Sequence, residues 1–119
     1  MKSKTDIDFT NQGVFTLENN KIIRKLFLGF IHIHILHHAK EHPIYGSWML
    51  DELREHGYTI SAGTLYPILH GMEADGLLLK EEQLVDGKIR KYYRITEKGA
   101  AILIEARAKA YELFKEIKE

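Results

Sequence analysis

The stretch from Ser61 to Thr96, SAGTLYPILHGMEADGLLLKEEQLVDGKIRKYYRIT, decides the fold. Its first part favours a short helix that ends at Gly76, because glycine readily adopts the left-handed conformation that terminates helices. Two further runs, residues 77–83 and 89–95, lie on either side of Asp86-Gly87, a dipeptide that is typical of hairpin turns. The stretch therefore predicts a helix followed by a two-stranded hairpin.

Pro67 leaves two interpretations of where this helix starts. A proline inside a helix cannot donate its hydrogen bond and crowds the preceding turn. With Thr64 as the N-cap, Pro67 would be the third helical residue, whose amide needs no partner within the helix. With Ser61 as the N-cap, the helix would need a tighter first turn.

Three further helices are expected. The first runs from a cap at Asn19 or Asn20 to about residue 40, and apolar residues cover more than half of its circumference. A helix this apolar is expected to pack between partners rather than lie on a surface. The last helix follows a cap at Thr96, and its apolar residues recur at the 3-4-3-4 spacing of a two-heptad seam, namely Leu103, Ala106, Ala110, Leu113 and Ile117.

The remaining helix is expected over residues 44–56. Its inward stripe comprises Tyr45, Met49 and Leu53. Gly46 would allow a close helix crossing. Trp48 lies off the stripe, so it would either line a ligand cavity or a dimer contact, or pack against the first or last helix.

Length and composition exclude several classes of protein. The 119 residues, 45% of them hydrophobic, are enough for one modest core and not for a second domain. The chain has no cysteine, and its longest apolar run is too short to span a bilayer. No signal-peptide pattern and no catalytic motif appears, so we expect a cytoplasmic protein that is not an enzyme and needs no cofactor.

The charge distribution points to a nucleic-acid partner. The 17 basic and 17 acidic residues cancel, yet five of the six charged residues between Lys88 and Lys98 are basic. The outer face of the Ser61–Gly76 helix carries no charge and is polar at Tyr66 and His70, with Thr64 near the helix start, where hydroxyls and free amides often meet phosphate. Lys88 and Arg90 lie beside the hairpin tip.

A helix followed by a basic hairpin is the layout of a winged helix-turn-helix, in which the helix enters a DNA groove and the hairpin contacts phosphate. The expected fold is therefore mainly α with a small β-hairpin. It comprises an N-terminal tail or arm (1–18), the winged helix (19–96) and a C-terminal helix (97–119) in a single domain. The zero net charge leaves open the alternative of a winged helix that binds other proteins and not DNA.

The histidines leave a second alternative open. Five lie between residues 32 and 42, and His34 and His38 share one helical face at a spacing that can bind a metal ion. A helix pair supplies only two ligands, however, so we predict no metal site and expect these side chains to pack at a helix end or an interface. A regulator that responds to metal or pH through the cluster is the alternative.

Residues 42–78, HPIYGSWMLDELREHGYTISAGTLYPILHGMEADGLL, followed by GKIRKYYRITEKG at 87–99, resemble the PadR-type transcriptional regulators of prokaryotes. The family pattern has a proline turn into YG, then S-x-GTLY, L-x-x-[ML]-E-x-x-GL and a hairpin that ends in KYYR-[LI]-TEKG. The similarity covers about residues 22–100.

The resemblance implies a homodimeric repressor that binds a palindromic operator. The last helix of each subunit would pack on its partner through the 3-4-3-4 seam. The DNA contacts implied are Thr64, Tyr66, Lys88, Arg90 and Lys91; the last rests on the resemblance alone, because strand alternation turns its stem inward.

Some members of the family respond to a small aromatic effector in a cavity between the subunits, and such an effector would give Trp48 a role in this chain. The chain departs from the family at Trp48 and at the histidines, and its region after Thr96 is short, which implies a smaller dimer interface.

Overall fold

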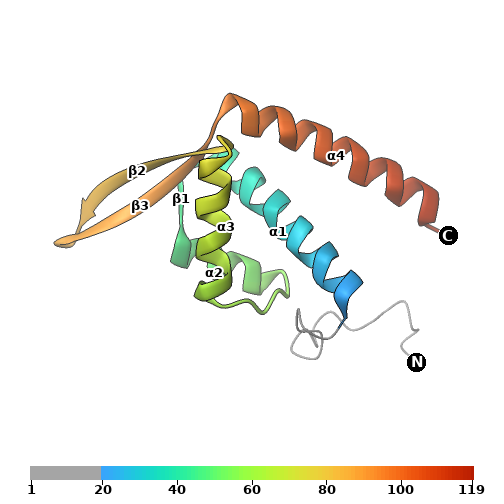
Figure 1. Ribbon diagram of the computed structural model, residues 1–119, viewed down its shortest axis with the longest axis horizontal. Helices are drawn as coiled ribbons and strands as arrows, with labels where there is room; N and C mark the ends of the chain where they lie inside the picture. The colour runs from blue at the N-terminus through green and yellow to red at the C-terminus, as the bar shows by residue number, and fades with distance from the viewer. Residues whose placement is uncertain (1–19) are drawn as a thin grey trace.

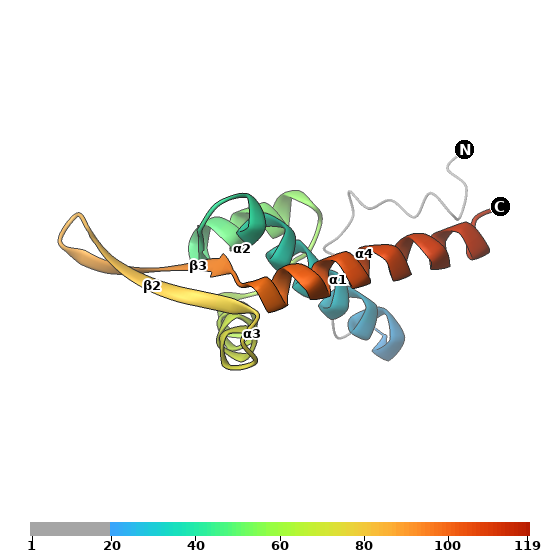
Figure 2. The ribbon, with the colours of Figure 1, turned by 90° about the horizontal axis from the view of Figure 1, so that it is seen from above.

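The computed structural model describes residues 20–119 (Figure 1). The expected tail or arm at 1–18 lies outside these residues. The elements are α1 (Lys21–Glu41), β1 (Ile44–Tyr45), α2 (Gly46–Glu55), α3 (Ala62–Ala74), β2 (Leu78–Val85), β3 (Lys88–Ile95) and α4 (Glu97–Ile117). The β2–β3 hairpin projects from one side of the helices and α4 extends towards the other (Figure 2).

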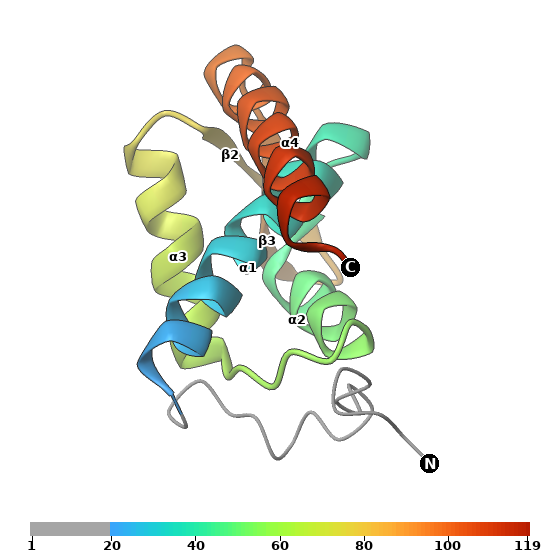
Figure 3. The same ribbon diagram turned by 90° about the vertical axis from the view of Figure 1, so that its right-hand side faces the viewer.

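Helix α1 is the centre of the domain. Its cap is Asn20, whose side chain accepts hydrogen bonds from the amides of Ile22 and Ile23 at 2.9 and 3.1 Å. The helix ends before Pro43, which disfavours helical geometry at the preceding residue. It contacts α2, β3 and α4, and Figure 3 shows it between α2 and α3 with α4 crossing it, so the prediction of a helix packed between partners is confirmed.

Helix α3 starts at the earlier of its two candidate caps. Ser61 is the N-cap, and its carbonyl accepts from the amides of both Thr64 and Leu65 at 3.0 Å, so the first turn is tight as that choice required. Pro67 lies inside the helix. The helix is terminated by Gly76 (φ +79°), two residues beyond its last residue. There the amides of Gly76 and Leu77 donate back to the carbonyls of Glu73 and Met72, both at 2.9 Å.

The predicted hairpin is confirmed, with slightly longer strands. Asp86 and Gly87 both have positive φ, 51° and 78°, as a two-residue hairpin turn of this type requires. The strands pair from Leu78↔Ile95 at the base to Val85↔Lys88 at the tip.

The expectation of a helix from residue 44 was wrong at its start. Ile44 and Tyr45 form β1, which pairs antiparallel with β3 opposite Tyr93 and Tyr92, so the sheet has three strands in the order β1-β3-β2. The proline at 43 keeps the chain extended, and the otherwise open edge of β3 supplies hydrogen-bonding partners. Tyr45 therefore belongs to the sheet, whereas Met49 and Leu53 are buried on α2 as predicted.

One core holds the elements together. It is built from the buried apolar residues Phe27, Ile31, Ile35, Leu36, Ala39, Ile44, Met49, Leu53, Ile60, Leu65, Leu69, Met72, Leu78, Tyr93 and Leu103. Only Gly99 and Leu103 of α4 are buried, so most of that helix is exposed. Thr96 caps α4 by accepting from the Gly99 amide at 3.0 Å and also donates to the Gly76 carbonyl at 2.6 Å.

Among residues 20–119, no helix is long and apolar enough to cross a membrane.

Candidate nucleic-acid interface

An open cleft of about 680 Å³ separates the hairpin from the starts of α2 and α3. Its lining comprises Tyr45, Gly46, Ser47, Tyr66, Val85, Asp86, Lys88, Ile89, Arg90 and Lys91. The outer face of α3 and the hairpin together supply six predicted DNA contacts, Thr64, Tyr66, His70, Lys88, Arg90 and Lys91. Four of them lie around this cleft: Tyr66, Lys88, Arg90 and Lys91. The other six lining residues were not predicted, three of them at the end of β1 and the start of α2 (Tyr45, Gly46 and Ser47) and three near the hairpin tip (Val85, Asp86 and Ile89). Tyr45 was missed because strand β1 was not predicted.

Tyr66 is the α3 side chain that reaches the cleft. It is 40% exposed, and its ring lies against Gly46 at the start of α2. A Cβ atom at position 46 would overlap the Tyr66 ring and hydroxyl. Gly46 therefore allows a close approach at the start of α2, and the group that approaches is the Tyr66 side chain of α3.

Arg90 is held in place by two tyrosines. Its guanidinium lies 4.1 Å from the centroid of the Tyr45 ring and donates to the Tyr92 hydroxyl at 3.4 Å. The two tyrosine rings meet edge to face at 5.4 Å. The hydrogen bond that Arg90 donates to Tyr92 raises the pKa of Arg90 above its ordinary value. The side chain is therefore a permanent cation at the cleft. The contact with the Tyr45 ring and the hydrogen bond to Tyr92 together fix the direction of the guanidinium.

Lys88 and Lys91 are exposed at the cleft. Lys91 shares a strand face with the buried Tyr93, as alternation requires, but at its position the hairpin has extended beyond the core and its cross-strand partner is Glu82. Its stem therefore meets solvent and not the core.

Two of the five basic residues between positions 88 and 98 lie outside the cleft lining and are paired with other parts of the chain. Arg94 donates to one oxygen of Glu81 at 2.8 and 3.2 Å, and Lys98 donates to the Asp75 carbonyl at 2.8 Å. The basic charge at the cleft thus comes from Lys88, Arg90 and Lys91.

Thr64 and His70 lie on α3 but do not line the cleft. Thr64 is half-buried in the first turn, its hydroxyl 3.5 Å from that of Ser61. His70 is exposed one turn after Tyr66, with the two ring centroids 6.4 Å apart. Both remain predicted contacts for a groove that extends along α3.

Some residues of the predicted apolar seam of α4 are buried in the core of the chain, and others are exposed on its surface. Leu103 packs in the core of its own chain and Ala106 is half-buried, whereas Ala110, Leu113 and Ile117 are exposed. A second groove, of about 530 Å³, runs between α1 and α4. Its aromatic lining is Phe30, Tyr58, Tyr111 and Phe114.

Trp48 packs against the end of α1, which is one of the alternatives that its position allowed. Its ring meets those of His38 and His42 edge to face at 5.4 and 4.9 Å. It does not line the hairpin cleft or the α1–α4 groove.

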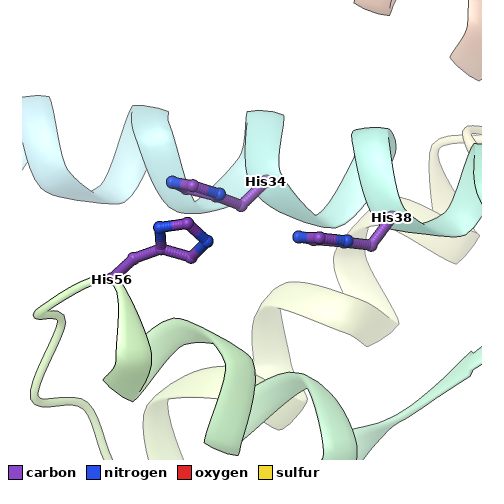
Figure 4. A group of neighbouring side chains, drawn as sticks. All are labelled: His34, His38 and His56. Atoms are coloured by element: carbon purple, nitrogen blue, oxygen red, sulfur yellow. The ribbon is translucent and has the colours of Figure 1, made fainter.

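The histidines of α1 meet two residues of α2 that sequence reasoning did not single out. His34 and His38 point towards His56, which follows the last residue of α2 (Figure 4). Glu52 lies between two of them, with its Oε2 atom 3.3 Å from His38 Nε2 and 3.2 Å from His56 Nε2. Burial, with the neighbouring His56, lowers the pKa of His34 to about 4, and burial lowers that of His38.

The elements together define a winged-helix protein: α2 and α3 form the helix-turn-helix, and the hairpin paired to β1 forms the wing. The model of the Transcriptional regulator PadR-like family matches residues 35–105. The chain belongs to this family, and the resemblance seen in its motifs is confirmed.

Individual relatives agree with this assignment. The chain is 49% identical to the transcriptional regulator Rv3488 of Mycobacterium tuberculosis over 87 residues, which are 73% of this chain and 81% of that protein. It also resembles the crystal structure of a PadR family transcriptional regulator from Eggerthella lenta, with a TM-score of 0.72 and 34% identity over 82% of this chain and 86% of the other. A PadR-like transcriptional regulator from Bacillus cereus gives a TM-score of 0.72 at 27% identity over 78% and 92% of the two chains.

Proposed function

We propose that this transcriptional regulator is a cytoplasmic repressor that binds a palindromic DNA operator as a homodimer. The observation that carries the proposal is the cleft itself: Tyr66 from α3 and three basic side chains from the wing, Lys88, Arg90 and Lys91, surround one opening. An aromatic side chain on a helix next to clustered cations suits a duplex, whose bases lie in the groove and whose phosphates flank it.

In this proposal α3 enters the major groove, with Tyr66 and His70 towards the base edges. Thr64 lies in the first turn of α3, where a hydroxyl beside helix amides suits a phosphate. The wing lies over the adjacent backbone. Tyr45 and Tyr92 fix the direction of Arg90 before DNA binds. Binding therefore costs less side-chain conformational entropy than it would for an arginine without such contacts.

The exposed apolar residues of α4 support the dimer. Leu113 and Ile117 are 51% and 65% exposed, and Tyr111 and Phe114 add aromatic surface on the same helix. An apolar patch of this kind on a helix that leaves its own core marks a contact with another chain. A second copy of α4, packed through the seam and against the exposed residues of α1, would cover it. A two-fold dimer would then read two half-sites of inverted sequence.

Fluorescence anisotropy tests the proposal. The protein is titrated onto a duplex from upstream of its own gene and onto a scrambled duplex, at low and at physiological salt. We expect tighter binding to the first duplex and a marked loss of affinity as salt rises, because counterions are released from each phosphate that is contacted.

Absence of binding to either duplex at low salt would favour the alternative of a winged helix that binds other proteins. The zero net charge of the chain is the observation behind this alternative.

A further inference from the structure

We propose that His34, His38, His56 and Glu52 form a binding site for a divalent transition metal ion of the zinc class, which links α1 to the end of α2. The site is separate from the cleft between the hairpin and the starts of α2 and α3, whose lining includes none of these four residues. The proposal does not depend on the proposed repressor function.

The four side chains converge from two elements. One ring nitrogen from each of the three histidines lies within 4.8 Å of those of the other two. Figure 4 shows His34 and His38 directed from α1 towards α2, and His56 directed from the end of α2 into the space beside them. Glu52 of α2, four residues before His56, supplies the fourth donor.

The distances to Glu52 suit tetrahedral coordination. Bonds of about 2.0–2.1 Å from zinc to nitrogen or oxygen place neighbouring ligand atoms of a tetrahedron about 3.3–3.4 Å apart. Glu52 Oε2 lies 3.3 Å from Nε2 of His38 and 3.2 Å from Nε2 of His56. Glu52, His38 and His56 thus already show two of the ligand-to-ligand distances that a tetrahedral ion requires. Rotation of the His34 ring towards the space between these three side chains would supply the fourth ligand.

The donor set selects the metal. Imidazole suits zinc, nickel, cobalt and copper, whereas calcium and magnesium prefer ligands that are all oxygen. Four protein ligands leave no open position, which is the pattern of a structural or sensing site and not of a catalytic one.

A competing set shares one ligand. His37, His38 and Glu41 also offer three donors within 4.8 Å of one another. All three lie on α1, and the carboxylate is farther from both rings, at 3.7 and 4.0 Å. The set that spans two helices has the shorter distances and the more buried carboxylate, since the Glu52 side chain is 22% exposed and that of Glu41 is 56% exposed.

Trp48 provides a direct readout. It is the single tryptophan of the chain, and its ring centroid is 5.4 Å from that of His38. Cobalt(II) bound at the site should quench its fluorescence and show the intense visible absorption of tetrahedral cobalt. The experiment uses the full chain without a histidine tag, treated with chelator and then dialysed, and titrated first with cobalt(II) and then with zinc(II) as competitor.

We expect one cobalt ion per chain, displaced by zinc, and a higher melting temperature in zinc because the ion binds the folded state. His56→Gln and Glu52→Gln should each weaken binding by at least about tenfold, a loss of the size seen even for residues that only support metal ligands. His37→Gln is the matched control, an exposed histidine on α1 outside the proposed site, and should bind cobalt as the wild type does.

Two results would overturn the proposal. One is a wild-type protein that shows neither quenching nor cobalt absorption up to a severalfold molar excess of metal. The other is the reverse pattern among the variants, with binding lost in His37→Gln and retained in His56→Gln, which would place the ion on the α1 set. Far-ultraviolet circular dichroism of each variant verifies that the fold is retained.

Discussion

The ring of Tyr66 occupies the space that any side chain at position 46 would need. Gly46 begins α2 and Tyr66 lies on α3, so the two helices of the helix-turn-helix meet through a glycine and an aromatic ring. The ring lies partly inside this contact and partly in the cleft, so the same residue spaces the helices and, in the proposed complex, would also contact DNA.

Gly46→Ala should destabilise the domain by about 1–3 kcal/mol, the usual cost of adding a methyl group to a packed contact. Denaturant unfolding measures the change. The double variant Gly46→Ala with Tyr66→Ala should recover most of that loss, because the clashing ring is gone. Equal losses in the two backgrounds would mean that the methyl group disturbs something other than Tyr66.

Tyr66→Ala alone should weaken operator binding by about 1–3 kcal/mol, the range of a side chain that contacts bases. The fold should persist, because Tyr66 is 40% exposed and lies outside the buried core. Anisotropy on the operator gives the affinity, and Tyr66→Phe separates the contribution of the hydroxyl from that of the ring. Wild-type affinity in the alanine variant would remove Tyr66 from the interface.

Lys88→Ala combined with Arg90→Ala should lower affinity for operator and scrambled DNA alike. The slope of log affinity against log salt should become shallower by about two, since each lost phosphate contact removes about one.

A charge-balanced control exists on the same hairpin, because Arg94 and Glu81 form an ion pair at 2.8 Å. Removing both, as Arg94→Ala with Glu81→Ala, deletes no net charge and should leave the slope near that of the wild type. A slope that is unchanged in the Lys88 and Arg90 variant as well would place the wing away from the phosphates.

Tyr45→Leu should reduce the affinity for operator DNA without removing any charge from the protein. The ring of Tyr45 lies 4.1 Å from the Arg90 guanidinium, and a contact of this kind at a surface contributes about 0.5–1 kcal/mol. We expect a severalfold weaker complex whose salt slope equals that of the wild type, measured by the same titration. If Arg90 has first been replaced by alanine, Tyr45→Leu should have little additional effect.

Leu113→Glu should convert the proposed dimer to monomers in sedimentation velocity, because it places a charge in an apolar contact of α4. Leu84→Glu makes the same change at a leucine of the wing that is 75% exposed, and should leave the assembly unchanged. A dimer that survives Leu113→Glu would show that the subunits meet elsewhere.

Local signals predicted the hairpin turn and the cap of α4 correctly, and they left two candidate caps each for α1 and α3. Asp86-Gly87 specified the hairpin because both residues must adopt positive φ, and few other pairs do so readily. Gly76 marked the end of α3 for a similar reason. Strand β1 could not be predicted in this way, since Ile44 and Tyr45 are a strand only through their pairing with β3.

The histidine cluster, too, could be predicted only in part, because some of its members meet only in the folded chain. His34 and His38 were recognised because their spacing places them on one helical face. Glu52 and His56 lie more than a dozen positions later in the sequence, and only the packing of α2 against α1 brings them alongside. Local spacing indicates which residues share a helix face, but which residues meet across two elements depends on how the elements pack.

Thr96 is the only residue between β3 and α4, and its side chain bonds both to Gly76 behind it and to Gly99 ahead of it. The connection therefore has no hinge, and the angle between the wing and the C-terminal helix is fixed by the fold. In the proposed dimer, this rigidity would set the separation of the two recognition helices. Such a dimer would tolerate base changes in its operator more readily than the insertion of a single base pair between the half-sites.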